Sequence, residues 1–148
     1  MRDLVFVDTN VFVYARDASE PVKGKQARSW LRALWQSRRG RVGFQVLNEY
    51  YVTVTQKLDP GMTMAAARAD VDSLMAWRPI VVDLSVTKGA FELQDQYSLS
   101  WWDALVVSAA RVADCRHLLT EDLQDQQGFG DLVVVNPFLH DVREILEG

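Results

Sequence analysis

Four acidic residues stand where an α/β protein could use them for chemistry. Asp8 directly follows a short apolar run at residues 4–7, and Asp122 follows a second apolar run in the same way. Glu49 lies inside a segment with helical spacing, and Asp103 opens a segment that is almost wholly apolar afterwards. Because parallel α/β sheets bind ligands outside the carboxyl ends of their strands, these acids are candidates for one shared site.

Each acid also has a structural explanation. Asp103 completes an S-x-x-[DE] capping-box pattern. Asp8 or Asn10 could cap the helix after the first strand, and Asp122 could do the same later in the chain. Glu49 could favour the first turn of a helix electrostatically. However, a buried carboxylate needs a cationic partner or a metal, and no Lys or Arg adjoins Asp8, Glu49 or Asp103 in the sequence. A shared cation is the hypothesis that accounts for all of these positions together.

Strands and helices must alternate to bring these acids together. The expected strands are residues 4–7, 80–84, 117–119 and 132–135, and the expected helices are residues 21–37, 45–58, 63–77, 85–97 and 101–113. The alternation predicts a three-layer α/β/α domain with a short, mainly parallel sheet. In such a fold Asp8 and Asp122 emerge at one carboxyl edge of the sheet, and Glu49 and Asp103 reach that edge from helices.

Length and composition limit the protein class. The 148 residues contain no linker-like stretch, so we expect one domain over residues 1–148. The net charge of −4 argues against a general nucleic-acid coat, although it permits an acidic site that holds a cation. The single Cys115 suits a reducing compartment, and no long apolar run or signal-type segment is present. We therefore expect a cytoplasmic protein without a membrane span.

The blocks VDTNVFVYA, FQVLNEYYV, LSWWDALVVSAA and LLTEDLQD resemble the PIN-domain ribonucleases, specifically the VapC-like toxins of type II toxin–antitoxin pairs. The resemblance spans nearly the whole chain, and the blocks occur in the family's order. It implies that the acidic metal site and its supporting polar groups are Asp8, Glu49, Asp103 and Asp122 with Asn10 and Thr120.

Two positions depart from the family pattern. Gly43 and Phe44 precede Gln45 where related chains often carry small hydroxyl residues, and this could alter support near Glu49. Gln126 replaces a glycine that commonly follows the LQD segment. The role of the neighbouring Asp125 as an extra acid is therefore open.

The ligand types indicate the metal and the reaction. Carboxylate oxygens without a Cys or His cluster favour Mg²⁺ or Mn²⁺ over zinc. One or two such ions could activate a water and neutralise charge on the leaving oxygen. The resemblance implies a metal-dependent endoribonuclease that hydrolyses RNA phosphodiester bonds and leaves a 5′ phosphate and a 3′ hydroxyl. It also implies a homodimer and a small antitoxin protein that presents Arg to the acids.

An acidic site repels RNA, so basic groups elsewhere must contact the RNA backbone. Arg38, Arg39 and Arg41 are the candidates for this contact, and the alternative is a solvated loop. The five tryptophans could stack on bases, but their helical spacing favours core or interface positions. Cys115 has no identifiable partner for nucleophilic chemistry and is expected to be buried and inert.

Two other functions remain open from the sequence. A haloacid-dehalogenase-like phosphatase also places an Asp after its first strand, but it needs a second Asp two positions later, where this chain has Asn10. A noncatalytic protein-interaction module would explain the aromatic helices but not the recurrence of acids at strand ends. Metal titration distinguishes these classes.

Overall fold

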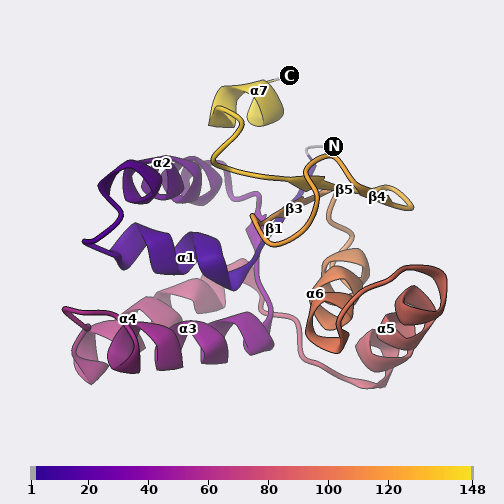
Figure 1. Cartoon of the computed structure of the whole chain (residues 1–148), viewed down its shortest axis with the longest axis horizontal. Coiled ribbons are helices and arrows are strands. Elements are labelled where there is room, and N and C mark those ends of the chain that lie inside the picture. Colours follow the sequence, from indigo (N-terminus) through magenta and orange to yellow (C-terminus); the bar gives the residue numbers. More distant parts are fainter. Residues whose placement is uncertain (1–2, 148) are drawn as a thin grey trace.

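The computed structural model describes residues 3–147, which form one sheet with helices around it (Figure 1). The strands are β1 (Val5–Val7), β2 (Gly40–Arg41), β3 (His117–Leu119), β4 (Gly128–Phe129) and β5 (Leu132–Val135), in the order β2-β1-β3-β5-β4. Only the pairing of β4 with β5 is antiparallel within this part of the chain. The short, mainly parallel sheet and the α/β class are as the sequence predicts.

The helices fill the segments between the strands. They are α1 (Thr9–Arg16), α2 (Pro21–Ser37), α3 (Phe44–Gln56), α4 (Met64–Ser73), α5 (Leu84–Gln96), α6 (Trp101–Val112) and α7 (Val142–Leu146), with a 3₁₀ helix η1 (Leu74–Trp77). Figure 1 shows α1 to α4 gathered on one side of the molecule, α5 and α6 on another, and α7 beyond the sheet. Among residues 3–147, no helix is long and apolar enough to cross a membrane.

The strand expected at residues 80–84 is wrong. Only Ile80 pairs there, through an isolated bridge to Gly43. Val81 and Val82 are 59% and 41% exposed, so this apolar run is not a buried strand. The Asp83 carboxylate accepts the N–H of Val86 at 3.0 Å and starts α5, because an N-cap side chain satisfies a free amide of the first turn.

The core forms where β1 and β3 meet the helices. Phe6, Leu118 and Trp30 are almost fully buried, and a large apolar side chain that leaves water contributes about 1.5 to 3 kcal/mol. The Trp30 Nε1–H donates to the carbonyl oxygen of Pro137 at 3.0 Å, so its one polar atom is satisfied. This packing makes the strand ends a rigid base for the residues that follow them.

Helices α5 and α6 approach each other at Gly89. A Cβ at this position would lie 2.5 Å from the Ser108 Oγ, which is closer than packed atoms allow. The Ser108 hydroxyl donates to the carbonyl oxygen of Val86 at 2.7 Å in the buried interface. The position of α6, which carries Asp103 in its first turn, therefore depends on a glycine in α5.

Candidate active site

The carboxylate of Asp8 lies at the carboxyl end of β1 and is almost buried, with 7% exposure. Its Oδ1 accepts the N–H of Thr9 at 2.8 Å and caps α1. Its Oδ2 accepts the Thr120 hydroxyl at 2.9 Å, just past the end of β3. The capping role proposed for Asp8 is confirmed, but it uses only one carboxylate oxygen.

Burial raises the pKa of Asp8 to about 6, because loss of water disfavours a charged carboxylate. The Thr9 N–H and the Thr120 hydroxyl oppose this rise by donating to the charged form. The negative charges of Asp122 and Glu49 add to it. The carboxylate of Asp8 would therefore gain stability from a cation bound beside it.

A hydrogen-bond network holds Asp122 beside Asp8. The Asn10 Nδ2 donates to the Thr120 Oγ1 at 2.9 Å and to the Asp122 Oδ2 at 3.1 Å. The Thr120 Oγ1 also accepts the N–H of Asp122 at 3.1 Å. The capping alternative for Asp122 is wrong, since no helix of the described residues begins there. Asn10 and Thr120 thus link the segments that follow β1 and β3.

The pKa of Asp122 is raised, mainly because partial burial disfavours its charge. The hydrogen bond from Asn10 opposes this change. Repulsion from Glu121, Asp103 and Glu49 adds to the rise. The charges of Glu49 on α3 and Asp103 on α6 therefore act on Asp122.

Glu49 reaches the site from α3. Its Oε2 accepts the Thr9 hydroxyl at 2.7 Å, and its Oε1 accepts the Gln45 amide at 3.0 Å. The apolar neighbours of Glu49 in the sequence favour a helix face turned inward, but its side chain is exposed. It is the sixth residue of α3, beyond the first turn, so it does not act as a helix-start charge.

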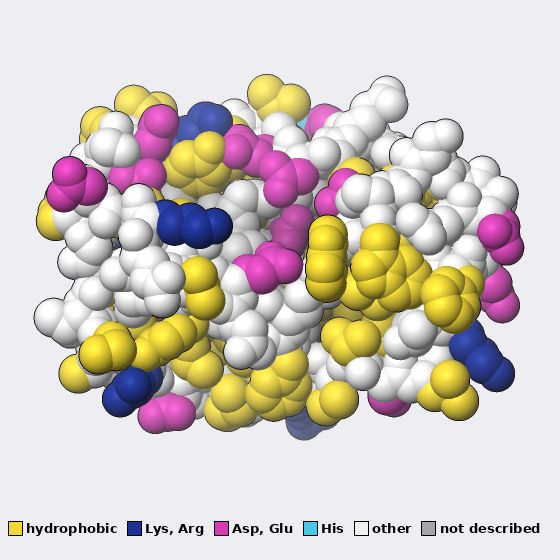
Figure 2. All heavy atoms as spheres, turned by 60° about the horizontal axis from the view of Figure 1, so that its bottom comes forward, with side chains coloured by type: hydrophobic (Ala, Val, Ile, Leu, Met, Phe, Trp, Pro, Cys, Tyr) yellow, Lys and Arg dark blue, Asp and Glu magenta, His cyan; other side chains and the backbone are white. Residues whose placement is uncertain are grey.

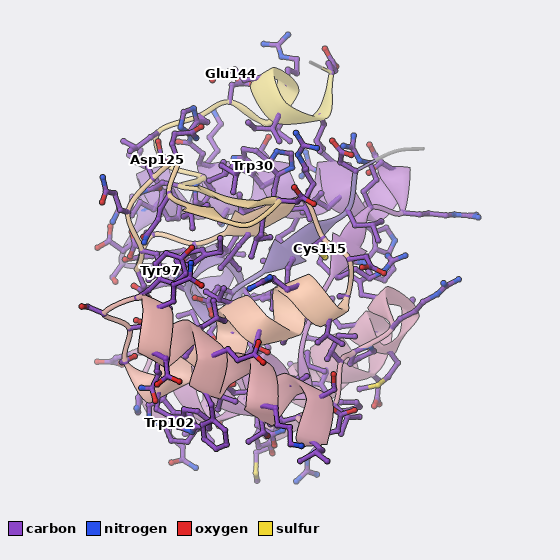
Figure 3. The ribbon with its side chains drawn as sticks, turned by 90° about the vertical axis from the view of Figure 1, so that its right-hand side faces the viewer. Trp30, Tyr97, Trp102, Cys115, Asp125 and Glu144 are labelled. Atoms are coloured by element: carbon purple, nitrogen blue, oxygen red, sulfur yellow. The ribbon has the colours of Figure 1, made fainter. Side chains whose placement is uncertain are left out.

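Asp103 lies in the first turn of α6 and is half-buried, and its charge contributes to the raised pKa of Asp122. The Ser100 Oγ accepts the N–H of Asp103 at 3.1 Å and caps the helix. In the described part of the chain, the Asp103 side chain returns no bond to Ser100, so the capping box is half formed. Its neighbour Trp102 is 63% exposed and points outward from α6 (Figure 3).

The four acids have no cationic partner in the part of the chain that the structure describes. In residues 3–147 none of Asp8, Glu49, Asp103 and Asp122 forms a salt bridge. Figure 2 shows acidic side chains gathered in the middle of one face, with hydrophobic side chains beside them. An oxygen-only donor set suits Mg²⁺ or Mn²⁺. As the described side chains stand, no three His, Cys, Asp or Glu residues are grouped closely enough to hold a metal ion.

Asp125 belongs to a different cluster. Its Oδ2 lies 2.7 Å from the His140 Nε2, and its Oδ1 accepts the N–H of Asn136 at 2.8 Å. The His140 Nδ1 lies 3.1 Å from the Glu144 Oε2 on α7. Burial acts to raise the pKa of Asp125, but the bonds from Asn136 and His140 outweigh it, and the pKa is lowered. Asp125 therefore joins the loop between β3 and β4 to the segment between β5 and α7 (Figure 3).

Several supporting contacts were missed by sequence reasoning. Thr9 lies inside the VDTN block and Gln45 lies one helical turn before Glu49, so the i to i+4 spacing was the available signal for Gln45. Tyr14 donates to Glu121 at 2.6 Å, and Lys23 lies 3.0 Å from the same carboxylate. This pairing keeps the acid beside Asp122 neutralised by a cation of its own.

The predicted arginine run does not lie at the acidic site. Arg39 is buried, and its guanidinium donates to the carbonyl oxygens of Asp3 at 2.7 Å and Leu146 at 3.0 Å. Arg38 precedes β2, which runs parallel to β1, so it lies at the amino edge of the sheet. Arg41 lies within β2 itself, where it pairs with Phe6 of β1.

The tryptophans differ in burial, and Cys115 is buried. Trp30 and Trp77 are buried as predicted, whereas Trp35 and Trp102 are 48% and 63% exposed. Cys115 is buried between α6 and the sheet (Figure 3), and burial raises the pKa of its thiol to about 12. The thiol is therefore unreactive, as the sequence predicts.

The fold and site define an α/β domain with an acidic centre at the carboxyl edge of a parallel sheet. Residues 5–127 match the PIN domain family, and the chain belongs to that family. No curated protein matches the chain in sequence.

Three solved structures share the fold at low sequence identity. A toxin–antitoxin complex from Klebsiella pneumoniae is 17% identical, covers 90% of this chain and 97% of its own, and has a TM-score of 0.65. Rickettsia felis VapBC2, bound to a DNA fragment from its promoter, is 16% identical, with coverages of 88% and 96% and a TM-score of 0.58. Mycobacterium tuberculosis VapC20, a sarcin–ricin loop cleaving toxin, is 18% identical, with coverages of 77% and 86% and a TM-score of 0.55.

Proposed function

We propose that this protein is a metal-dependent endoribonuclease and the toxin of a toxin–antitoxin pair. The observation that carries the proposal is the hydrogen-bond network of Thr9, Asn10 and Thr120 with Asp8, Glu49 and Asp122. The charge of Asp103 adds to the raised pKa of Asp122, and none of the four acids forms a salt bridge in residues 3–147. Membership of the PIN domain family supports it. RNA as the substrate is supported by the likeness to VapC20, which is described as cleaving the sarcin–ricin loop.

The acidic side chains would hold Mg²⁺ or Mn²⁺. Asp8 is fixed by its hydrogen bonds, and Glu49 and Asp122 would have to move toward it for the three carboxylates to share one ion. Asp103 would complete the set from α6. When bound, the ion would polarise the scissile phosphate and activate a water.

The protein's own residues prepare this chemistry by position and charge. Asn10 and Thr120 hold the strand-end acids in register, and Thr9 turns Glu49 toward Asp8. Asp8 and Asp122 are mostly charged only above their raised pKa values, so the site should bind a cation more tightly as pH rises. The products are an RNA with a 5′ phosphate and one with a 3′ hydroxyl, formed without a covalent enzyme intermediate.

A small antitoxin protein is the partner of this toxin. The likeness to toxin–antitoxin complexes supports this assignment. An arginine of the antitoxin would pair bidentately with the acids, because a planar guanidinium matches a carboxylate. The homodimer and the cytoplasmic location stay predictions, to be measured by light scattering and by fractionation.

The experiment is cleavage of total RNA by the purified protein with Mg²⁺, with Mn²⁺ and with EDTA. We expect metal-dependent cuts, and sequencing of RNA ends should show 5′ phosphates. Cleavage of equal rate in EDTA, or release of inorganic phosphate from phosphate monoesters in place of RNA cleavage, would contradict the proposal.

A further inference from the structure

A second set of charged side chains surrounds a hollow away from the acidic site. The hollow has a volume of about 320 Å³ and is lined by Trp35, Arg38, Arg41, Ala76, Trp77 and Arg78. Arg38 directly follows α2 and Arg78 directly follows η1. Since Arg38 precedes β2 and Asp8 follows the parallel strand β1, the hollow and the acids lie toward opposite edges of the sheet.

The three arginines of the hollow are not neutralised. None of them forms a salt bridge in residues 3–147. The Arg41 Nη1 donates to the carbonyl oxygens of Gly40 at 2.8 Å and Arg38 at 3.3 Å, which holds its guanidinium in place. Arg38 and Arg78 are exposed. A chain with a net charge of −4 thus carries a local positive site.

The backbone at two of these arginines is unfavourable for any residue except glycine. Arg38 has φ 60° and Arg78 has φ 53°, both in the left-handed region, and each caps the helix before it. Glycine is the usual residue at such caps because it has no Cβ. In residues 3–147 four non-glycine residues have a positive φ, and two of them, Arg38 and Arg78, line this one hollow.

Two tryptophans complete the hollow. Trp77 is 4% exposed, and its ring packs so closely on Gly40 that a Cβ there would lie 2.6 Å away. Trp35 is 48% exposed and lies with its ring centroid 6.1 Å from that of Trp77. An exposed indole beside guanidinium groups offers a stacking surface for an unpaired base.

We propose that this hollow binds an RNA strand, with Arg38, Arg41 and Arg78 on its phosphates and Trp35 against a base. The inference rests on the proposed ribonuclease function. It adds a contact with the RNA away from the acidic site at which the RNA would be cleaved. Guanidinium groups pair with phosphate in a planar, bidentate way, and the acidic remainder of the chain makes such a contact necessary. Long RNA substrates would use the hollow, and short oligonucleotides bound at the acids would not.

The test compares Arg38→Gly/Arg78→Gly with the charge-matched control Arg32→Gln/Arg116→Gln, whose arginines are exposed and lie outside the hollow. Binding of a labelled single-stranded RNA of about 20 nucleotides is followed by anisotropy in EDTA, over a series of salt concentrations. Loss of two phosphate contacts should weaken binding roughly tenfold and lower the slope of log K against log[salt] by about 1.4. The glycine variant should melt at the same or a higher temperature.

Three results would overturn the assignment. Equal losses in both double variants would indicate general charge, and unchanged binding in the glycine variant would remove the hollow from RNA recognition. Loss of binding to a Glu-rich peptide, with RNA binding intact, would assign the hollow to an acidic protein segment. Because the binding assay contains no metal, absent cleavage would contradict the proposed function without affecting this test.

Discussion

Two groups of acids in this molecule differ in what faces them. Asp125 and Glu144 flank His140, and both carboxyl pKa values are lowered. Asp8 and Asp122 are removed from water and face other acids, and both pKa values are raised, mainly by burial. The first group stabilises the fold through hydrogen bonds to its own histidine, whereas the second needs a cation from outside. Asp125, His140 and Glu144 therefore form a structural clamp, because its acids have a partner within the protein. The acids of the candidate metal site have no such cationic partner in residues 3–147.

The largest expected effect separates the two groups by one substitution in each. Asp103→Asn should lower RNA cleavage by orders of magnitude while the fold persists, because the backbone N–H that Ser100 caps remains. Asp125→Asn should leave cleavage near that of the wild type and lower the melting temperature, since it loses the ionic contact with His140. Cleavage of an RNA pool and thermal melting measure both outcomes. Near-normal cleavage by Asp103→Asn would remove this residue from the mechanism.

Metal binding should stabilise only one of the two groups. Mg²⁺ or Mn²⁺ at a hundred times its dissociation constant should add about 2.7 kcal/mol to the free energy of unfolding of the wild type. Asp8→Asn should gain much less from the metal, and in EDTA it should melt no lower than the wild type, because it buries no charge. Melting curves over a metal titration test this difference. An equal metal-dependent shift in both proteins would contradict the role of Asp8.

The contact between Thr9 and Glu49 should have an intermediate effect. Thr9→Val removes the hydroxyl that donates to Glu49 at 2.7 Å, and a hydrogen bond to a charged group contributes about 1.5 to 3 kcal/mol. We expect cleavage to fall roughly ten- to a hundredfold. Thr87→Val is the matched control, because that hydroxyl donates to the carbonyl oxygen of Asp83 outside the site. Equal rates for the two variants would show that Thr9 does not position Glu49.

The smallest expected effect is the pH dependence of the clamp. The hydrogen bond with Asp125, followed by that with Glu144, raises the pKa of His140. Its stabilisation is therefore complete below the ordinary histidine pKa of about 6.5 and is lost as pH rises through the raised value. At low pH, protonation of Asp125 and Glu144 removes their contact with His140, so the stabilisation is lost there as well. In urea unfolding from pH 6 to 9, His140→Gln should have the flatter profile, and parallel profiles would contradict the clamp.

The strand-end acids could be predicted because their signal is local. An apolar run followed by an acid defines both the strand and the edge, and β3 and β5 match their predicted residues. Helix α2 likewise matches its predicted bounds, since Pro21 starts it and its apolar spacing continues to its end. The resemblance to the PIN-domain ribonucleases then predicts Glu49 and Asp103 as further members of the acidic site.

The parts that depend on distant contacts could not be predicted in this way. β2 and β4 are two residues each and contain glycine, so neither has a readable strand pattern. The apolar run at residues 80–84 resembles a strand, but in the described chain it pairs with the sheet only through the bridge between Ile80 and Gly43. Arg39 looked like its neighbours in sequence, and only the fold shows that its guanidinium is buried.

The contact between Gly89 and Ser108 has a consequence for how related chains can change over time. With so little space between α5 and α6, substitutions at the two positions should be correlated. Alanine at residue 89 becomes tolerable once residue 108 loses its hydroxyl, and a larger pair would separate the helices and displace Asp103. Selection on one acidic side chain therefore extends to a pair of small residues that would never touch the substrate.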